Sequence, residues 1–390
     1  MHIAYVCTDP GVPVFGRKGC STHIQEILRA FRKHGAHVTV FAARTDGTPP
    51  ADLHDLSLHR LPIWADTNRR ARATSADAAN SAMRLLLDRA GPFDLIYERY
   101  SLWSIGAMEY ARSSGTAGLL EINAPLIDEE ARYRSLTDPV SAMRFTRQSF
   151  STASILIVVS NSLTTYVKQY RDRDDGVHVV PNGVDPARFP PGLAPSLPAT
   201  DGAFTVGFLG SLKPWHGLMT LVEAFGRLHR SASNTRLLIV GDGPERKRVT
   251  AYLSAHKLLG ATTFTGAVDS TDVPGLLASM DVGAAPYSNR SDFYFSPLKV
   301  YEYMAAGLAV VASDLGQVGE VIEHGVDGLL CRPDDATAWT TTLGQLYEHR
   351  DLGLRLGSAA RQKVAQHHSW DAIALRILDL AGMPVMEART

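Results

Sequence analysis

Short apolar runs alternate with stretches of helical periodicity along the first half of the chain. The runs have the length and composition of buried strands and lie at His2–Thr8, His37–Ala43, Asp94–Glu98, Gly118–Ile122 and Ile155–Ser160. Helical spacing of apolar residues predicts helices near Ser21–His34, Asn68–Arg89, Leu102–Ser113 and Asn161–Tyr170. Apolar strands interleaved with helices predict a parallel sheet with both faces covered.

The second half has the same architecture without repeating the sequence. Strands are predicted at Phe204–Gly210, Arg236–Gly241, Thr262–Gly266, Asp281–Pro286, Ala309–Ser313 and Gly328–Cys331. Helices are predicted at Trp215–Arg230, Pro244–Lys257 and Ser296–Gly307, followed by a helical tail over Asp334–Leu380. The end of this tail, Trp370–Leu380, is apolar enough to need a partner, and we expect it to cross back to the first half.

The length of 390 residues and the two alternating series predict two domains. The Pro-rich segment Pro190–Asp201 lacks periodicity and is interpreted as a linker. We therefore expect one domain over residues 1–190, completed by the helix 369–390, and a second over 201–368. In this α/β interpretation both are doubly wound, Rossmann-like domains that face each other across a cleft. Ligands of such sheets bind outside the carboxyl ends of the strands.

Composition narrows the classes of function. The chain carries 39 Lys and Arg against 40 Asp and Glu, a net charge of −1, so it lacks the basic field of a nucleic-acid binder. Its three cysteines, Cys7, Cys20 and Cys331, are far apart, which fits a reducing cytosol and no structural zinc site. The start of the chain does not resemble a signal peptide, and no run of about eighteen apolar residues occurs, so a cytoplasmic protein is expected.

The stretch SPLKVYEYMAAG, from Ser296 to Gly307, combines a helix start with charges that suit an anion. Ser296 is predicted to cap the helix and Pro297 to take its first position. Lys299 and Glu302 then project from one side. A cation in the first turn costs about 0.3–1 kcal/mol against the helix dipole, and a docked phosphate would remove that cost. The two interpretations of this stretch are a nucleotide-sugar clamp and a capped amphipathic helix with an incidental ion pair.

Three further motifs carry less information. GRKGCS, residues 16–21, has the composition of a phosphate-binding turn between a strand and a helix, and equally that of a surface turn. GDGPER, from Gly241, departs from the dinucleotide fingerprint because Arg246 replaces its third glycine, which disfavours a nicotinamide oxidoreductase. Asp172 and Asp174 have the spacing of a DxD metal motif, but the polar run around them favours a solvated turn.

Several stretches together resemble family 4 of the retaining glycosyltransferases, which have the two-domain GT-B fold. The similar segments are VPNGVDPARF (Val180–Phe189), GFLGSLKPWHGLMTLVEAF (Gly207–Phe225), LLIVGDGPER (Leu237–Arg246), FTGAV (Phe264–Val268), MDVGAAPYS (Met280–Ser288) and the SPLK-containing stretch Ser296–Leu330. The resemblance covers the whole second domain and the frame of the first.

The resemblance implies a donor site in the second domain. Glu302 matches the second acid of the family's E-x₇-E motif, which binds ribose hydroxyls, whereas Tyr294 replaces the first acid and Asp292 is the nearest carboxylate. In relatives with the SPLK variant, the backbone around Phe295–Leu298 is expected to hold the donor sugar or diphosphate. The implied donor-binding residues are Gly19, Gly210, Ser211, Lys213, His216, Gly241, Phe264, Gly266, Phe295, Ser296, Pro297, Leu298, Lys299 and Glu302.

The charges of the donor loop differ from the family pattern. Ser211 replaces the usual Arg and His216 the usual Lys, so Lys213 and Lys299 are expected to hold the diphosphate, with a pH-dependent contribution from His216. No metal or other cofactor is then required. Such enzymes are thought to use a front-face route, in which the leaving phosphate takes the proton of the acceptor and the protein supplies positioning and charge.

In the first domain, Tyr97, Glu98, Arg99 and Asn123 occupy places where many family members carry histidines that face the donor sugar. The predicted catalytic residues are Lys213, Lys299, Glu302 and Asn123, and the predicted acceptor contacts are Glu98, Arg99, Asn123 and Glu129. The resemblance implies transfer from a UDP- or GDP-linked sugar to a hydroxyl of a small natural product, lipid or glycan. A nucleotide-sugar epimerase and a sugar phosphorylase of the same fold remain alternatives, as does a non-catalytic binding module.

The basic residues Arg69, Arg70 and Arg72 leave open a weak peripheral contact with anionic lipid, as in lipid-glycosylating relatives. The sequence does not decide the donor base, the sugar, the acceptor or the oligomeric state.

Overall fold

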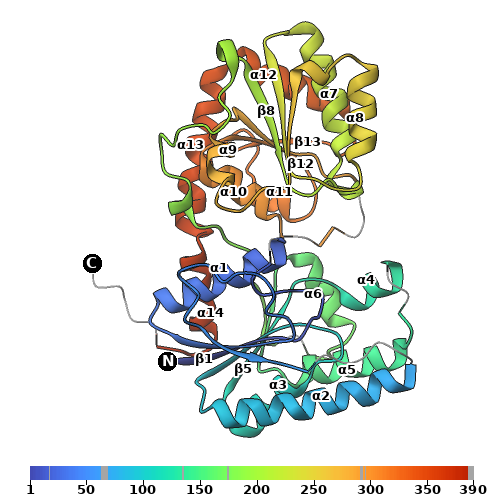
Figure 1. Ribbon diagram of the computed structural model, residues 1–390, viewed down its shortest axis with the longest axis vertical. Helices are drawn as coiled ribbons and strands as arrows, with labels where there is room; N and C mark the ends of the chain where they lie inside the picture. Colours follow the sequence, from blue (N-terminus) through green and yellow to red (C-terminus); the bar gives the residue numbers. More distant parts are fainter. Residues whose placement is uncertain are drawn as a thin grey trace. The chain divides into compact units, whose positions relative to one another are not determined.

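The structure is a computed structural model that describes residues 1–16, 18–62, 69–133, 136–173, 175–289, 293–294 and 296–384. The chain forms two compact units (Figure 1). The first comprises Met1–Asn182 and Trp370–Thr390, and the second comprises Gly183–Ser369.

A parallel sheet of seven strands forms the centre of the first unit. Its strands are β1 (His2–Cys7), β2 (His37–Ala42), β3 (Ser57–Arg60), β4 (Leu95–Arg99), β5 (Ala117–Ile122), β6 (Ile155–Val158) and β7 (Val177–Val179). They lie in the order β3-β2-β1-β4-β5-β6-β7. The strand order reverses between β1 and β4, and open α/β sheets bind ligands beside such a switch point.

Helices cover both faces of this sheet, as the alternating pattern predicted. They are α1 (Gly19–Lys33), α2 (Arg69–Ala90), α3 (Gly106–Ser114), α4 (Leu126–Tyr133), α5 (Pro139–Thr152), α6 (Asn161–Lys168) and α14 (Trp370–Leu380). The pattern missed α5, although its start carries its own signal: the Ser141 amide donates to the Asp138 carboxylate at 3.1 Å. It also missed β3, because this edge strand is mostly exposed and lacks apolar alternation.

The C-terminal helix α14 belongs to the first unit, as predicted from its apolar residues, and packs beside α1. Its Trp370 ring meets the His23 ring of α1 edge-on, with 5.1 Å between the ring centroids. Lys33 of α1 forms an ion pair with Asp371. Ile373 and Ile377 are buried, and burying side chains of this size contributes about 1.5–3 kcal/mol each. The helix is therefore part of the core of this unit.

The second unit contains a parallel sheet of six strands. These are β8 (Phe204–Leu209), β9 (Thr235–Val240), β10 (Thr262–Gly266), β11 (Val282–Ala285), β12 (Ala309–Ser313) and β13 (Leu329–Cys331), in the order β10-β9-β8-β11-β12-β13. Its helices are α7 (Leu218–Ser231), α8 (Arg246–Ala255), α9 (Val273–Leu277), α10 (Leu298–Ala306), α11 (Gln317–Val321), α12 (Ala336–Glu348) and α13 (Arg350–His367). All six strands predicted for this half are confirmed.

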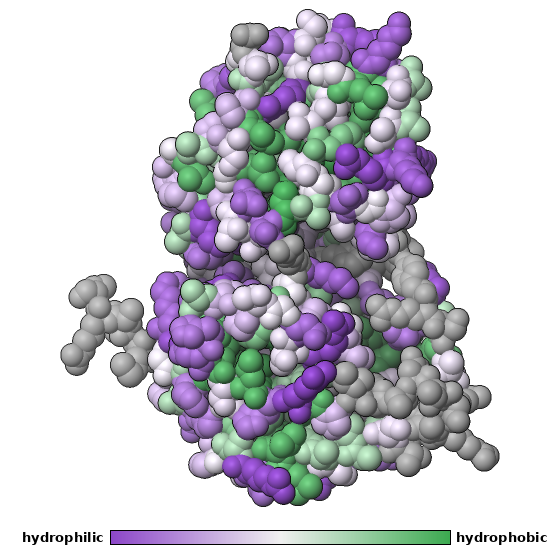
Figure 2. Space-filling model, viewed as in Figure 1, coloured by the Kyte–Doolittle hydropathy of each residue, from purple (hydrophilic) through white to green (hydrophobic). Residues whose placement is uncertain are grey.

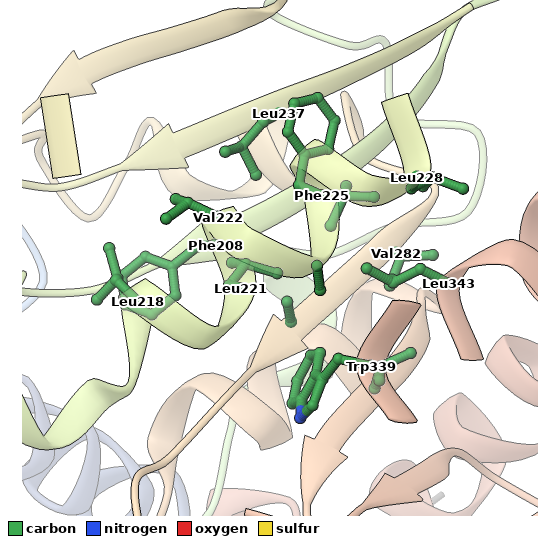
Figure 3. Close-up of a cluster of buried hydrophobic side chains, with 14 of the residues drawn as sticks. Phe208, Leu218, Leu221, Val222, Phe225, Leu228, Leu237, Val282, Trp339 and Leu343 are labelled. Carbon is green, nitrogen blue, oxygen red and sulfur yellow. The ribbon is translucent and has the colours of Figure 1, made fainter. Parts of the chain in front are cut away.

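Large apolar side chains fill the space between this sheet and its helices (Figure 3). Leu221 and Phe225 of α7 lie close to Phe208 of β8, and Trp339 of α12 extends the same cluster. All four side chains are fully buried. Phe208 is the last but one residue of its strand, so this core supports the carboxyl end of the sheet.

The segment 183–201, expected to end the first domain and to form a linker, lies in the second unit. Backbone and side-chain hydrogen bonds attach it there. The Val184 amide donates to the His368 carbonyl at 2.9 Å, and Arg361 donates to the Phe189 carbonyl at 2.5 Å. Arg236 donates to the Leu197 carbonyl at 2.8 Å. No pattern in the sequence marks these contacts, because the backbone carbonyl of any residue can accept such a hydrogen bond.

Hydrophilic and hydrophobic residues are interspersed over the face of both units that Figure 2 shows. Among the helices that the structure describes, none is both long enough and apolar enough to cross a lipid bilayer.

Candidate functional site

Glycine-containing loops meet at the carboxyl ends of the strands in the second unit. Gly210 follows β8 and Gly241 follows β9, with φ angles of +131° and +129° that side chains other than hydrogen rarely allow. A Cβ atom on Gly241 would lie 2.1 Å from the Gly210 carbonyl oxygen, so the two loops are in backbone contact. The close approach of the two loops leaves no room for a side chain at Gly241, so only backbone atoms of these two glycines border the ends of β8 and β9 here.

Lys299 of α10 points toward these loops. A Cβ atom on Gly210 would sit 3.1 Å from its Nζ atom. The Lys299 side chain is 8% exposed, and its ammonium lies 4.2 Å from the ring centroid of Phe208 and 5.3 Å from that of Tyr287. Within the described part of the chain, Nζ has no hydrogen-bond partner. Aromatic faces attract a cation, but they do not replace the hydrogen bonds that a buried ammonium requires.

The surroundings of Lys299 also change its acidity. Burial lowers the pKa of Lys299 to about 7, although the nearby Glu302 carboxylate opposes that shift. The residue lies in the first turn of α10, where the helix dipole adds further positive potential. Docking an anion here would satisfy the ammonium and the dipole together.

The predicted hydroxyl cap of α10 is wrong. The helix begins at Leu298, and its N-cap residue is Pro297, which makes no side-chain cap hydrogen bond. A proline side chain has no acceptor, so the N-cap residue itself does not cap the amide groups of the first turn. Ser296 is buried just before the helix. Phe295 and Asp292 lie outside the described residues.

His216 is held neutral, in contrast to the pH-dependent charge expected for it. One ring nitrogen, Nδ1, is hydrogen-bonded to the Ser211 carbonyl. Burial, and then the positive charge of Lys299, lower the pKa of His216 to about 3. Lys213 is partly exposed, with its ammonium 5.8 Å from the Trp215 ring centroid. His216 therefore contributes no positive charge near neutral pH, and Lys213 of the loop and Lys299 of α10 remain the expected carriers of positive charge.

Glu302 lies one turn after Lys299 and is partly exposed. Its carboxylate is 3.7 Å from the guanidinium of Arg188, which also donates to the Ser270 carbonyl at 2.7 Å. Arg188 belongs to the segment 183–201 and was not among the predicted site residues. Its position in the VPNGVDPARF stretch was the available signal, but no spacing in the sequence pairs Arg188 with Glu302.

The remaining predicted donor residues lie around the same strand ends. Gly266 ends β10, and Phe264 of this strand supports Arg246, whose guanidinium is 3.9 Å from the ring centroid. Arg246, which stands where the dinucleotide fingerprint has its third glycine, thus packs against strand β10. In the first unit, Gly19 is the first residue of α1 and is exposed.

A buried polar cluster lies at the carboxyl ends of β4 and β5 in the first unit. Glu121 is 3.1 Å from His23 Nε2 and 3.9 Å from the Arg99 guanidinium, and all three side chains are largely buried. Burial alone would raise the pKa of Glu121, but the neighbouring His23 and Arg99 lower it to about 2. The structure thus brings Arg99 and His23 together around Glu121, and Asn123 follows the end of the same strand, β5. Sequence reasoning did not name Glu121 or His23 as site residues, although Glu121 stands only two positions before the predicted Asn123.

Two other predicted acceptor residues lie apart from this cluster. Glu98 alternates with Arg99 along β4, so its side chain lies on the opposite face of the sheet, where it accepts a hydrogen bond from Ser104. Glu98 is fully buried, and burial raises its pKa to about 7. Glu129 lies in α4 and is partly exposed.

Two predictions fall partly outside the described residues. Asp174 of the DxD motif is one of the residues that the structure does not describe, and neither are the side chains of Arg69, Arg70 and Arg72 at the start of α2. In the described ranges, no three His, Cys, Asp or Glu residues are grouped in a way that could hold a metal ion.

The amino-acid sequence matches the models of two known protein families, one in each half of the chain. Residues 17–188 match the family described as "Glycosyltransferase Family 4", and residues 203–349 match "Glycosyl transferases group 1". The chain belongs to glycosyltransferase family 4. The match extends over both halves of this family 4 protein, as the motifs of the sequence predicted.

Relatives of this family 4 protein differ in their substrates. It is 29% identical over 236 residues to the glycogen synthase of Mycobacterium tuberculosis, covering 58% of this chain and 55% of that protein. It is 34% identical over 205 residues to the phosphatidyl-myo-inositol mannosyltransferase of Mycolicibacterium smegmatis, covering 51% and 50%. The chain therefore spans about half the length of these relatives. A D-inositol 3-phosphate glycosyltransferase of Stackebrandtia nassauensis is 25% identical over 398 residues, covering 93% and 86%.

Solved structures place the chain in the GT-B fold. Sucrose-phosphate synthase from Thermosynechococcus elongatus superposes with a TM-score of 0.74 at 21% identity, over 97% of this chain and 98% of that one. Anabaena HepE in complex with UDP gives a TM-score of 0.72 at 18% identity, over 98% and 100%. The predicted α/β fold of two Rossmann-like domains is confirmed.

Proposed function

We propose that this protein transfers a sugar from a nucleotide-diphosphate sugar to a hydroxyl of an acceptor, with retention of configuration. The observation that carries the proposal is the buried ammonium of Lys299, which lies beside Gly210 at the start of α10, a helix whose N-cap proline makes no cap hydrogen bond. A buried charge without a partner costs several kcal/mol, roughly, and such sites are typically completed by a ligand of opposite charge. The diphosphate of a nucleotide sugar has the required charge and size.

In this proposal the donor is held by the second unit. Lys299 and the first-turn amides of α10 bind the diphosphate, and Lys213 adds charge from the exposed side of the loop. Glu302 accepts hydrogen bonds from the ribose hydroxyls, for which Arg188 must move away from the carboxylate or share it. The glycines after β8 and β9 allow the donor to approach the backbone. UDP and GDP donors both fit this description, and with the positive charges of Lys213 and Lys299 no metal ion is required.

The proposed reaction is a front-face displacement. The bond between the anomeric carbon and the leaving diphosphate oxygen breaks, and the acceptor oxygen bonds to that carbon on the same face. The acceptor's proton passes to the leaving phosphate. Lys299 stabilises the negative charge that develops on the diphosphate, which is the type of interaction that contributes most in enzymes without a covalent nucleophile.

The first unit is proposed to position the acceptor and the transferred sugar. Asn123 and Arg99 are the candidate contacts, because both lie at the strand ends beside the switch point between β1 and β4. Glu121 orients Arg99 through their ion pair and is itself held by His23. An acceptor such as a small natural product, lipid or glycan presents hydroxyls that an amide and a guanidinium can recognise.

The reaction class is tested with the intact protein and a panel of UDP- and GDP-linked sugars. Saturation-transfer NMR identifies the bound base and sugar, and an acceptor screen with that donor follows. NMR of the anomeric proton in the product should show the configuration of the donor, and chelation of metals should leave the rate unchanged. Inversion would contradict the proposal. Conversion of the donor without any acceptor would indicate an epimerase, and dependence on inorganic phosphate a phosphorylase.

Replacing Glu302 by alanine should weaken donor binding by about 10- to 100-fold, because hydrogen bonds to a charged group are worth about 1.5–3 kcal/mol. The effect should appear as a higher KM for the donor, measured by initial rates with saturating acceptor. Glu348→Ala, an exposed carboxylate at the end of α12, is the matched control and should leave KM unchanged. If the donor KM of Glu302→Ala lay within roughly twofold of the wild-type value, the proposed contact of Glu302 with the ribose would be contradicted.

A further inference from the structure

The first unit contains a cavity away from the strand ends discussed above. Its volume is about 560 Å³, within the range of small-molecule sites. It lies between α5 and the segment that follows α6; both helices are labelled in Figure 1. It is lined by Val140, Met143, Arg144, Arg147, Gln148, Ser151, Tyr170, Arg171 and Asp172.

Arg171 is the unusual member of this lining. The side chain is 4% exposed, and none of the three nitrogens of its guanidinium has a hydrogen-bond partner in the described structure. Burial lowers the pKa of Arg171, but a guanidinium remains charged in proteins. Five N–H donors are thus withdrawn from water without acceptors, which is the condition in which a buried charge is most costly. An acceptor-rich anion in the cavity would supply what is missing.

The rest of the lining fits an anion that also carries an apolar group. Arg144 and Arg147 are exposed on α5, so three guanidinium groups border the cavity against one carboxylate, that of Asp172. Val140, Met143 and the Tyr170 ring provide apolar surface beside them. Gln148 is already engaged, because its side-chain amide donates to Glu109 at 2.8 Å. Guanidinium forks match the geometry of phosphate oxygens and bind them through paired hydrogen bonds.

The cavity is separate from the proposed catalytic residues of the first unit. Tyr170, Arg171 and Asp172 follow the end of α6 and lead to the start of β7, so they lie on the side where the parallel strands begin. Arg99 ends strand β4 and Asn123 follows strand β5, so both lie where the parallel strands end, on the opposite side of the same sheet. A ligand in this cavity would therefore not occupy the position of the acceptor.

We propose that this cavity is a second ligand site, which binds the phosphate group of a small phosphomonoester. Arg171 receives the phosphate at the buried end, Arg147 and Arg144 neutralise it from the exposed side, and the apolar part of the ligand packs on Val140, Met143 and Tyr170. The site is independent of the donor and acceptor positions.

The test uses full-length protein that carries Lys299→Met, so that the donor site does not contribute to phosphate binding. Phenyl phosphate is the probe, because it combines a phosphomonoester with an apolar ring, and calorimetry gives its Kd. Adding Arg171→Met should raise this Kd at least about tenfold, since it removes charge-assisted hydrogen bonds. Arg147→Met, an exposed change that cannot disturb the core, should raise the Kd by about threefold or more. Circular dichroism checks that each variant is folded.

Arg112→Met is the matched control, since Arg112 is exposed on α3 and does not border the cavity. It should bind phenyl phosphate like the parent protein. Parental affinity in both cavity variants, or no saturable binding by the parent itself, would overturn the proposal. Equal weakening in the Arg112 variant would do so too, because it would indicate attraction by net charge alone.

Discussion

Replacing Lys299 by methionine should lower the rate of sugar transfer by about 10²–10³-fold, the loss typical when one preorganised donor to a developing negative charge is removed. The reason lies in the position of the ammonium, which is buried beside Phe208 and Gly210 and has no hydrogen-bond partner among the residues that the structure describes. Methionine fills a similar volume without charge. The measurement is kcat and KM for the donor with the best acceptor, and the fall should appear in kcat/KM.

Stability should change in the opposite direction for the same variant. Replacing a buried, unpaired charge by an apolar side chain of similar volume is neutral or stabilises by about 1–4 kcal/mol. Lys299→Met should therefore unfold at the same or a higher urea concentration than the wild type. Lys247→Met, an exposed change on α8, is the control and should alter neither rate nor stability. A near-wild-type rate in Lys299→Met would exclude a role of this residue in transfer.

The pH dependence gives a second readout of Lys299. Its pKa is about 7 in the folded protein and 10.5 in the unfolded reference, so the unfolded chain binds more protons between these values. The free energy of unfolding should consequently rise as the pH increases from 7 toward 10.5. The difference between wild type and Lys299→Met should shrink over the same range, measured by urea unfolding. If the difference in free energy of unfolding between the two proteins stayed constant over this range, the Lys299 ammonium would be in contact with water in the folded protein, which contradicts its burial.

Replacing Glu121 by alanine should lower the free energy of unfolding of the first unit by about 3–5 kcal/mol, the cost of breaking a buried ion pair. The substitution leaves Arg99 and His23 buried without the carboxylate that lies between them. Transfer should fall as well, because Arg99 loses the carboxylate that positions it. Urea unfolding, followed by circular dichroism, measures the first effect, and initial rates on the folded fraction measure the second.

The acid side of the stability profile tests Glu121 further. Its pKa is about 2 in the folded protein against 4.5 for the unfolded reference, so its contribution is complete above pH 4.5 and is lost as the pH falls toward 2. A shift of this size corresponds to roughly 3 kcal/mol. Glu121→Gln should remove this part of the acid sensitivity, and Glu348→Gln, an exposed control, should retain it. Identical acid profiles for wild type and Glu121→Gln would contradict the assignment.

Much of the fold was predictable because each domain uses buried parallel strands. Runs such as Phe204–Gly210 are apolar on both faces, and this pattern is hard to confuse with other structures. The edge strand β3 escaped because its residues SLHR are mostly exposed. The tail helix was placed with the first domain on its apolar character alone, which proved sufficient because α14 buries Trp370, Ile373 and Ile377.

The sequence predicts where the candidate site lies better than it predicts which side chains contact each other there. The helix start and the spacing of its charges led to Lys299 and Glu302, and motif resemblance added the glycines at the strand ends. Which side chains face each other depends on packing, so neither the contact of Arg188 with Glu302 nor that of His23 with Glu121 could be derived from spacing. The same holds for His216, whose charge state follows from burial rather than from residue type.

The packing of α14 against α1 has a consequence for how the protein is made. During synthesis the first unit emerges with the surface of α1 that receives Trp370 and Asp371 uncovered, and it stays so until these residues have left the ribosome. The second unit, which is continuous from Gly183 to Ser369, can complete its core earlier. The amino-terminal unit is therefore completed after the second, and a truncation before Trp370 would leave it without part of its core.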